Sequence, residues 1–133
     1  MVGFGRLTGL GVLALAAASA AGAQDNDVYT SAIDCGVLHA FYSGAKQGEA
    51  PDEAKQHIEI ATRYFTLAFD RDPGSGEQTS TAIETKTAAL IAKFEELVSD
   101  ATTTRAYFNQ RSESCNAFKM TVIEEFEAAD VNQ

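Results

Sequence analysis

The chain has 133 residues, with 19 Asp and Glu against 10 Lys and Arg, and a formal net charge of −9. No basic stripe is present, which argues against nucleic-acid binding, because that binding depends on Lys and Arg contacts to phosphates. The same deficit of cations argues against docking on anionic lipid. The partner classes that remain are basic proteins, cations and small neutral ligands, or no specific partner, and the acidic charge by itself also favours solubility.

The first 23 residues have the order of parts of a secretory signal peptide. Arg6 is the only charge before an apolar run at 7–18, and small residues at 21–23 precede a polar start. The run is too short and too rich in Gly and Ala for a membrane anchor. No Cys stands at the junction to accept a lipid. We expect cleavage after Ala23, with Ala18-Ser19-Ala20 as an alternative signal, and export of residues 24–133 to a Gram-negative periplasm or beyond.

The predicted mature chain, residues 24–133, is long enough for one domain and too short for two ordinary ones. Its two cysteines are Cys35 and Cys115. An even number of cysteines in an exported protein favours a disulfide over free thiols. Closing so long a loop stabilises the fold by about 4 to 5 kcal/mol in the chain-entropy model. We therefore expect a single helical domain with a covalent bridge.

Helical periodicity appears in four segments, and none shows the alternation of a strand. The sequence predicts an all-α fold, a small four-helix bundle in which the disulfide joins the first and last helices. The first helix is expected from about Val28 to Ala45. Pro51 opens the second helix, at a position where its missing N–H costs nothing. A turn at residues 72–76 ends this helix, because Pro73 disfavours helical geometry before it.

The second helix has the cleanest amphipathic pattern of the four, and we expect it at the centre of the bundle. The apolar residues of its main stripe are Ala54, Ile58, Ala61, Phe65 and Ala68. The residues that widen this stripe are Ile60, Tyr64, Leu67 and Phe69.

Two further segments follow the turn. A capping box is expected to start the third helix, formed by Ser75 with Gln78 or by Thr81 with Glu84. The apolar face of that helix is predicted to contain Ile83, Leu90, Ile91, Phe94, Leu97, Val98 and Ala101. Residues 102–104 are all Thr, a weak point for a helix, and the pattern leaves open whether the chain kinks or turns there.

The last helical segment is expected from about Arg105 to Ala129, with Cys115 on its core side. The residues predicted along that side are Phe108, Arg111, Cys115, Phe118, Val122 and Phe126. The acidic residues near its end are predicted to be frayed and solvated: Glu124, Glu125, Glu127 and Asp130.

The two histidines, His39 and His57, are the residues best suited to chemistry, because imidazole titrates near neutral pH and binds metals. His57 has Glu53 one turn before it, which gives two donors where a structural zinc site needs four and a catalytic one three. Neither histidine has a nucleophile or base partner in the sequence. We therefore predict no catalytic, cofactor-binding or metal residues and no enzyme. A small metal-binding protein that uses these histidines and nearby carboxylates remains an alternative.

Three tyrosines, Tyr42, Tyr64 and Tyr107, are candidates for the edge of a groove. Tyr64 and Tyr107 each adjoin a Phe, and neighbours on a helix point about 100° apart, so one ring of each pair leaves the core centre. We expect the groove to receive a peptide, a partner helix or a small apolar ligand. The main prediction for function is thus a non-catalytic binding or interaction module, with its partner and oligomeric state left open.

A stress-responsive holdase is the alternative function from another class. Small exported helical domains with one disulfide and many carboxylates can loosen in acid. In these broad features the chain resembles acid chaperones of the HdeA type, and that resemblance implies a periplasmic holdase. The cysteines of that family lie much closer together than Cys35 and Cys115, and no motif matches residue by residue.

Overall fold

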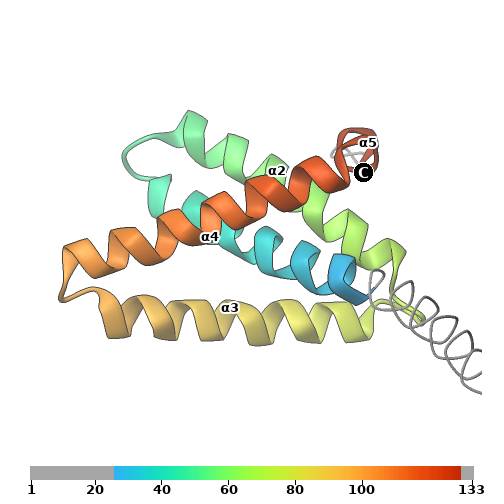
Figure 1. Ribbon diagram of the computed structural model, residues 1–133, viewed down its shortest axis with the longest axis horizontal. Helices are drawn as coiled ribbons and strands as arrows, with labels where there is room; N and C mark the ends of the chain where they lie inside the picture. Colours follow the sequence, from blue (N-terminus) through green and yellow to red (C-terminus); the bar gives the residue numbers. More distant parts are fainter. Residues whose placement is uncertain (1–25, 130–133) are drawn as a thin grey trace, which may run out of the picture.

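A computed structural model of the chain describes residues 26–129, which form five helices and no strand (Figure 1). The first helix covers residues 26–46. It is followed by α2 (Pro51–Asp70), α3 (Glu77–Leu97), α4 (Ala101–Thr121) and the short α5 (Ile123–Ala128). The predicted all-α fold is confirmed. The predicted signal peptide, residues 1–23, lies outside the described residues.

The first helix, rather than α2, occupies the centre of the bundle. Its side chains contact α2, α3 and α4, and five of its apolar residues are at most 4% exposed: Ala32, Ile33, Cys35, Val37 and Leu38. The expected central position of α2 is therefore wrong. α2 has one face in solvent, where Ile58 is 45% exposed. Its sharper amphipathic pattern is the mark of a helix at the bundle surface.

A close approach joins the first helix to α2. A Cβ atom added at Gly36 would clash with the ring of Phe65 on α2, so the missing side chain provides the space for that ring. The buried face of α2 carries small residues at Ala54, Ala61 and Ala68. These residues let the two helices pack closely, as small side chains do at helix contacts.

The start of α3 is held by Asp72 and not by a predicted capping box. Gly76 precedes the helix with a left-handed φ of 91°, and no side chain caps at that position. The Asp72 carboxylate instead accepts hydrogen bonds from the backbone N–H of Gly74 and from the N–H and hydroxyl of Thr79. Neither expected box is the cap of this helix, because the Asp72 carboxylate already accepts from the N–H of Thr79, the third residue of the helix.

The chain turns between α3 and α4, which settles the question left open at residues 102–104. Asp100 accepts hydrogen bonds from the N–H groups of Thr102 and Thr103, so it is the N-cap of α4. The three threonines thus form the first turn of a new helix. On α3, Leu90 is buried but Ile91 is exposed, and so is Val98 directly after the helix, in contrast to the predicted apolar face.

A second break, at Val122, separates α5 from α4, so the predicted single last helix is wrong. The end of α5 is anchored rather than frayed. Arg63 on α2 donates hydrogen bonds of 2.9–3.0 Å to the carbonyls of Phe126, Glu127 and Ala129. Glu125 accepts two hydrogen bonds from the guanidinium of Arg71. Glu124, Glu125 and Glu127 are exposed, as predicted, and Asp130 lies outside the described residues.

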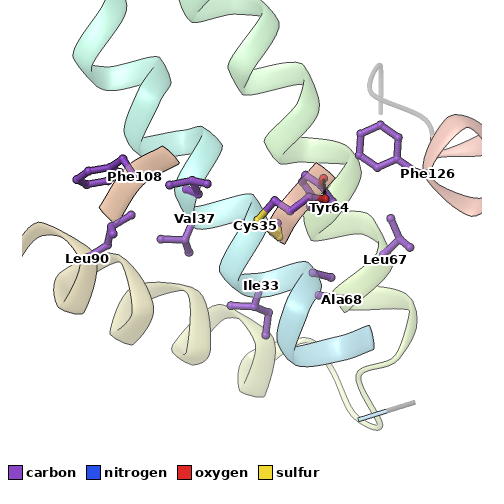
Figure 2. Packing of buried hydrophobic residues seen from close by; sticks show 12 residues of the cluster. Ile33, Cys35, Val37, Tyr64, Leu67, Ala68, Leu90, Phe108 and Phe126 are labelled. Carbon is purple, nitrogen blue, oxygen red and sulfur yellow. Dashed lines mark hydrogen bonds between the residues drawn. A yellow bond between two sulfur atoms is a disulfide. The ribbon is translucent and has the colours of Figure 1, made fainter. Parts of the chain in front are cut away.

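The predicted bridge is present and joins the first helix to α4. Cys35 and Cys115 are disulfide-bonded with their Cα atoms 5.6 Å apart. Figure 2 shows the bridge beside Tyr64 in the buried cluster, with Leu67 and Ala68 of α2 and Ile33 and Val37 of the first helix nearby. Within residues 26–129, no helix combines the length and the apolar character that a membrane span requires.

Candidate functional site

The two ends of the bundle are built differently. The disulfide end, as we call it, is the half of the bundle that extends from the Cys35–Cys115 bridge, near the middle of the first helix, to α5, and it includes Tyr64. The groove end contains the last turns of the first helix, the start of α2, the end of α3 and the start of α4. There an open, largely apolar cavity of about 650 Å³ lies between the helices. We call this cavity the groove, and it is the candidate functional site.

Aromatic rings line much of the groove. Phe41 of the first helix stacks on Phe108 of α4 with ring centroids 5.2 Å apart, and Phe94 of α3 lies 5.4 Å from Phe41. Small side chains at Ala45 and Ala101 line the same space. The rings are large and the residues beside them are short, so the facing helices leave space that their own side chains do not fill.

Polar groups line the groove beside the rings. The charged residues are Lys46, Glu53 and Arg105, and the uncharged polar ones include His57, Thr104 and Asn109. Lys46 and Glu53 form an ion pair of 3.5 Å between exposed side chains. The hydroxyl of Thr104 donates to backbone carbonyls of Leu97 and Asp100 and so stabilises the turn between α3 and α4. The groove therefore combines an apolar interior with a few placed polar groups, the usual composition of a ligand site.

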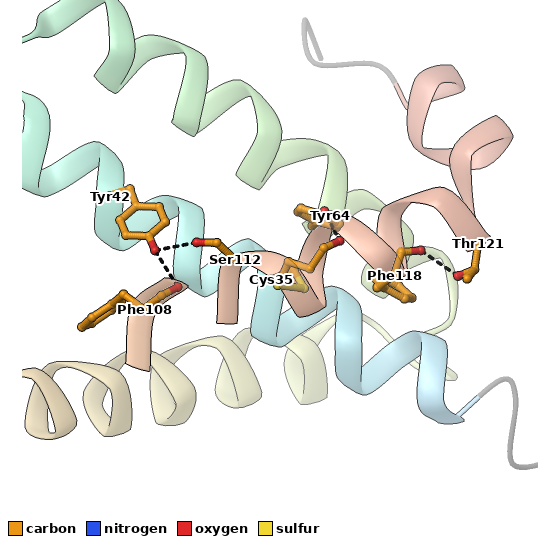
Figure 3. The surroundings of a disulfide bond; sticks show 8 residues. Cys35, Tyr42, Tyr64, Phe108, Ser112, Phe118 and Thr121 are labelled. Carbon is orange, nitrogen blue, oxygen red and sulfur yellow. Dashed lines mark hydrogen bonds between the residues drawn. A yellow bond between two sulfur atoms is a disulfide. The ribbon is translucent and has the colours of Figure 1, made fainter. Parts of the chain in front are cut away.

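The three tyrosines predicted at a groove edge do not come together. Tyr42 lines the groove, and its hydroxyl donates to the carbonyl of Phe108 and pairs with the hydroxyl of Ser112 at 2.7 Å (Figure 3). Tyr64 is only 1% exposed and donates to the carbonyl of Cys115. Burial raises the pKa of the Tyr64 hydroxyl to about 12. Tyr107 lies elsewhere on α4, where Arg111 donates to its hydroxyl.

The two histidines meet, although the sequence places them on different helices with no shared motif. The Nδ1 atoms of His39 and His57 are 3.0 Å apart. One ring must donate its N–H and the other must accept, so this hydrogen bond requires at least one neutral imidazole. His39 also stacks against Tyr64, with ring centroids 5.8 Å apart. His57 lines the groove, so the pair connects the groove to the interior between the first helix and α2.

Both histidines are held neutral. Burial, and after it the nearby His57 and Lys119, lowers the pKa of His39 from 6.5 to about 4. Burial also lowers the pKa of His57, where Glu53 opposes the shift and Lys46 adds to it. At neutral pH the pair is therefore an uncharged hydrogen bond and not a like-charge contact.

The described residues contain no cluster of three or more His, Cys, Asp or Glu side chains placed to hold a metal. Glu53, the nearest sequence candidate for a third ligand, is paired with Lys46. Cys35 lies four residues before His39, but its sulfur is in the disulfide.

Comparison with known proteins gives no relative from which a role can be taken. No protein-family model, no curated protein and no solved structure matches the chain. The class of the molecule, a disulfide-bridged helical bundle with an open apolar groove at one end, thus follows from its own geometry.

Proposed function

We propose that this protein is an exported, non-catalytic binding module that takes a small apolar ligand in the groove. The observation that carries the proposal is the aromatic lining formed by Phe41, Phe94 and Phe108 around an accessible cavity of about 650 Å³. Pockets for small ligands are commonly about 300–1,000 Å³ and mostly apolar, with a few polar groups that orient the ligand. The cavity fits a small molecule better than a whole partner helix.

Export to the periplasm or beyond is part of the same proposal. The signal-peptide pattern of residues 1–23 supports it, and so does the disulfide, since such bridges persist in oxidising compartments. The hydrogen bonds of His57, the one histidine that lines the groove within the described residues, agree with a binding role. The Nδ1 of His57 is engaged by His39, and the hydroxyls of Tyr42 and Thr104, which also line the groove, are hydrogen-bonded to groups other than His57.

A fluorescence titration of the oxidised mature protein with the neutral apolar dye Nile red tests the binding function. We expect saturable binding at one site. Val98 is 53% exposed and lines the groove, so Val98→Gln should weaken dye binding about tenfold, because an amide against an apolar ligand costs about 1–2 kcal/mol.

Ile91→Gln is the matched control, because Ile91 is a similarly exposed aliphatic residue of α3 that does not line the groove. Its dye affinity should equal that of the wild type. Absence of saturable binding, or equal losses in both variants, would refute the groove as the site. Saturation only by peptides would assign the groove to a protein partner.

A second candidate function, the acid-activated holdase, is favoured by the His39–His57 contact. Two imidazoles with Nδ1 atoms 3.0 Å apart cannot both be protonated and keep their hydrogen bond. Acid therefore weakens the contact between the first helix and α2 beside an aromatic groove.

Suppression of client aggregation at about pH 3, measured by light scattering, tests this second function, since acid exposes apolar surface in many small domains. Wild-type protein should suppress aggregation in acid and not at neutral pH. Aggregation that proceeds unchanged at acidic pH would remove the candidate.

A further inference from the structure

The groove has a positive net charge, whereas the whole chain has a negative one. The chain has a formal net charge of −9, yet the groove is lined by two cations, Lys46 and Arg105, and by one anion, Glu53. A positive site on an acidic protein selects for an anionic ligand, since the surrounding negative surface repels anions from other positions.

The two cations are not equivalent. Lys46 lies 3.5 Å from Glu53, so these two charges largely offset each other. Arg105 has no ion pair or hydrogen bond within residues 26–129, and its side chain is exposed. The net positive charge of the groove is therefore concentrated on the guanidinium of Arg105.

Arg105 is positioned to contact a ligand that lies on the aromatic rings. It stands in the second turn of α4, next to the groove-lining Thr104 and three residues before Phe108. Asn109, one turn further along α4, also lines the groove and adds amide donors on the same face of the helix. A polar head group that reaches Arg105 can thus keep its apolar body against Phe108 and Phe41.

A guanidinium offers paired N–H donors whose planar geometry matches both oxygens of a carboxylate. The described groove supplies one uncompensated cation, which matches the single charge of a carboxylate better than the double charge of a phosphate monoester. We propose that the ligand is an amphiphilic carboxylic acid, whose carboxylate pairs with Arg105 and whose aliphatic or aromatic body fills the groove. This inference rests on the proposed binding function and adds the chemical class of the ligand.

Competition titrations with three ligands of equal chain length test the head-group preference. Decanoate, decanol and decylamine are each used to displace Nile red from the oxidised mature protein at neutral pH and low salt. We expect decanoate to bind about tenfold more tightly than decanol, because a hydrogen bond to a charged group contributes about 1.5–3 kcal/mol. Decylamine should bind more weakly than either.

Arg105→Gln keeps the helix and removes the charge, so it should lower decanoate affinity about tenfold and leave decanol affinity unchanged. Arg111→Gln is the matched control, since Arg111 lies on the same helix but beside Tyr107 rather than in the groove. Its affinities should equal those of the wild type. Higher salt should weaken decanoate binding and not decanol binding.

The outcomes separate the two proposals. Equal affinity for decanoate and decanol, or equal losses of both in Arg105→Gln, would overturn the carboxylate inference while the apolar-ligand function stands. Preference for decyl phosphate over decanoate would overturn it as well. Failure of Nile red and all three ligands to bind would overturn the binding function itself.

Discussion

The disulfide end and the groove end of the bundle differ in how their helices are held together. At the disulfide end, a covalent bond joins the first helix to α4, and Tyr64 of α2 donates to the carbonyl of Cys115 beside it. At the groove end, the links are noncovalent and fewer groups are buried. They include a hydrogen bond from Ser43 to the carbonyl of Ala54 and the exposed ion pair of Lys46 with Glu53.

This difference teaches how a small domain can keep an open apolar cavity. A void forfeits packing contacts and therefore lowers the stability of the fold. In this protein the interactions that offset this loss of stability lie around the buried bridge and not at the groove. They include the disulfide itself and the hydrogen bond of Tyr64 beside it. We infer that substitutions at the disulfide end mainly change the free energy of unfolding, and that substitutions in the groove mainly change ligand affinity.

The largest expected effect comes from removing the bridge. Cys35→Ala with Cys115→Ala should lower the free energy of unfolding by about 4–5 kcal/mol, because the unfolded chain regains the entropy of the open loop. Urea denaturation of the variant and the wild type measures this loss. Val98→Gln at the groove end is the comparison, with an expected change within about 0.5 kcal/mol. A loss below about 1 kcal/mol in the double variant would break the proposed contrast.

The next effect concerns the anchor of α5. Arg63→Met removes the donor to three carbonyls at the end of that helix, and we expect a loss of about 2 kcal/mol. Hydrogen exchange should show faster exchange of α5 amides. Arg105→Met makes the same chemical change at the groove end, where the guanidinium has no partner among the described residues, and should be nearly neutral. Equal losses would show that the two ends depend alike on their arginines.

Two glycines of the first helix, Gly36 and Gly44, allow the packing at the two ends to be compared within one helix. Gly36→Ala forces a methyl group against Phe65 and should destabilise by about 1–3 kcal/mol. Gly44, near the groove, has no neighbour within 4 Å of an added Cβ, so Gly44→Ala should stabilise by about 0.5–1 kcal/mol through helix propensity. Thermal denaturation measures both changes. The same sign in both variants would contradict the structure.

The last comparison concerns the pH dependence of the contact between His39 and His57. The pKa of His39 falls from 6.5 to about 4 in the folded protein, so the unfolded chain binds more protons between these values. Stability is complete above pH 6.5 and is lost as the pH falls toward 4. The loss should be about 1–2 kcal/mol, reduced from the full shift because His39 is partly exposed.

His39→Phe keeps a ring beside Tyr64 and should flatten the pH dependence in this window. Urea denaturation at several pH values measures it. Both proteins should still lose stability at lower pH, because hydrogen bonds lower the pKa values of the Asp72 and Asp100 carboxyls, and the Arg71 contact lowers that of Glu125. A variant that keeps the wild-type slope between pH 6.5 and 4 would exclude the histidine pair as its cause.

Much of the fold could be predicted from sequence. Proline and glycine set the limits of helices through local backbone geometry, and two cysteines allow a single pairing. Pro51 begins α2, the turn around Pro73 ends it, and the two cysteines find each other. The central helix could not be identified in this way. A helix surrounded by neighbours shows less contrast between its faces than α2 does, so the strength of the amphipathic pattern indicated a surface helix.

The site was less accessible to sequence reasoning. Phe94 and Phe108 were correctly placed on apolar faces, but periodicity cannot tell a filled core from a groove whose facing positions are small. The meeting of His39 with His57 depends on how the first helix packs against α2, and spacing along one chain segment does not report that packing. The cap of α3 was missed because Asp72 lies seven residues before Thr79, outside the span of a capping box.

The bridge between Cys35 and Cys115 also has a consequence for the biogenesis of the protein. The chain contains two cysteines, so one intramolecular pairing exists and no isomer can compete with it. Oxidation therefore needs an electron acceptor and no reshuffling by an isomerase. Because synthesis proceeds from the N-terminus, Cys35 waits as a lone thiol until α4 has emerged. Until then, the error open to its sulfur is a mixed disulfide with another molecule.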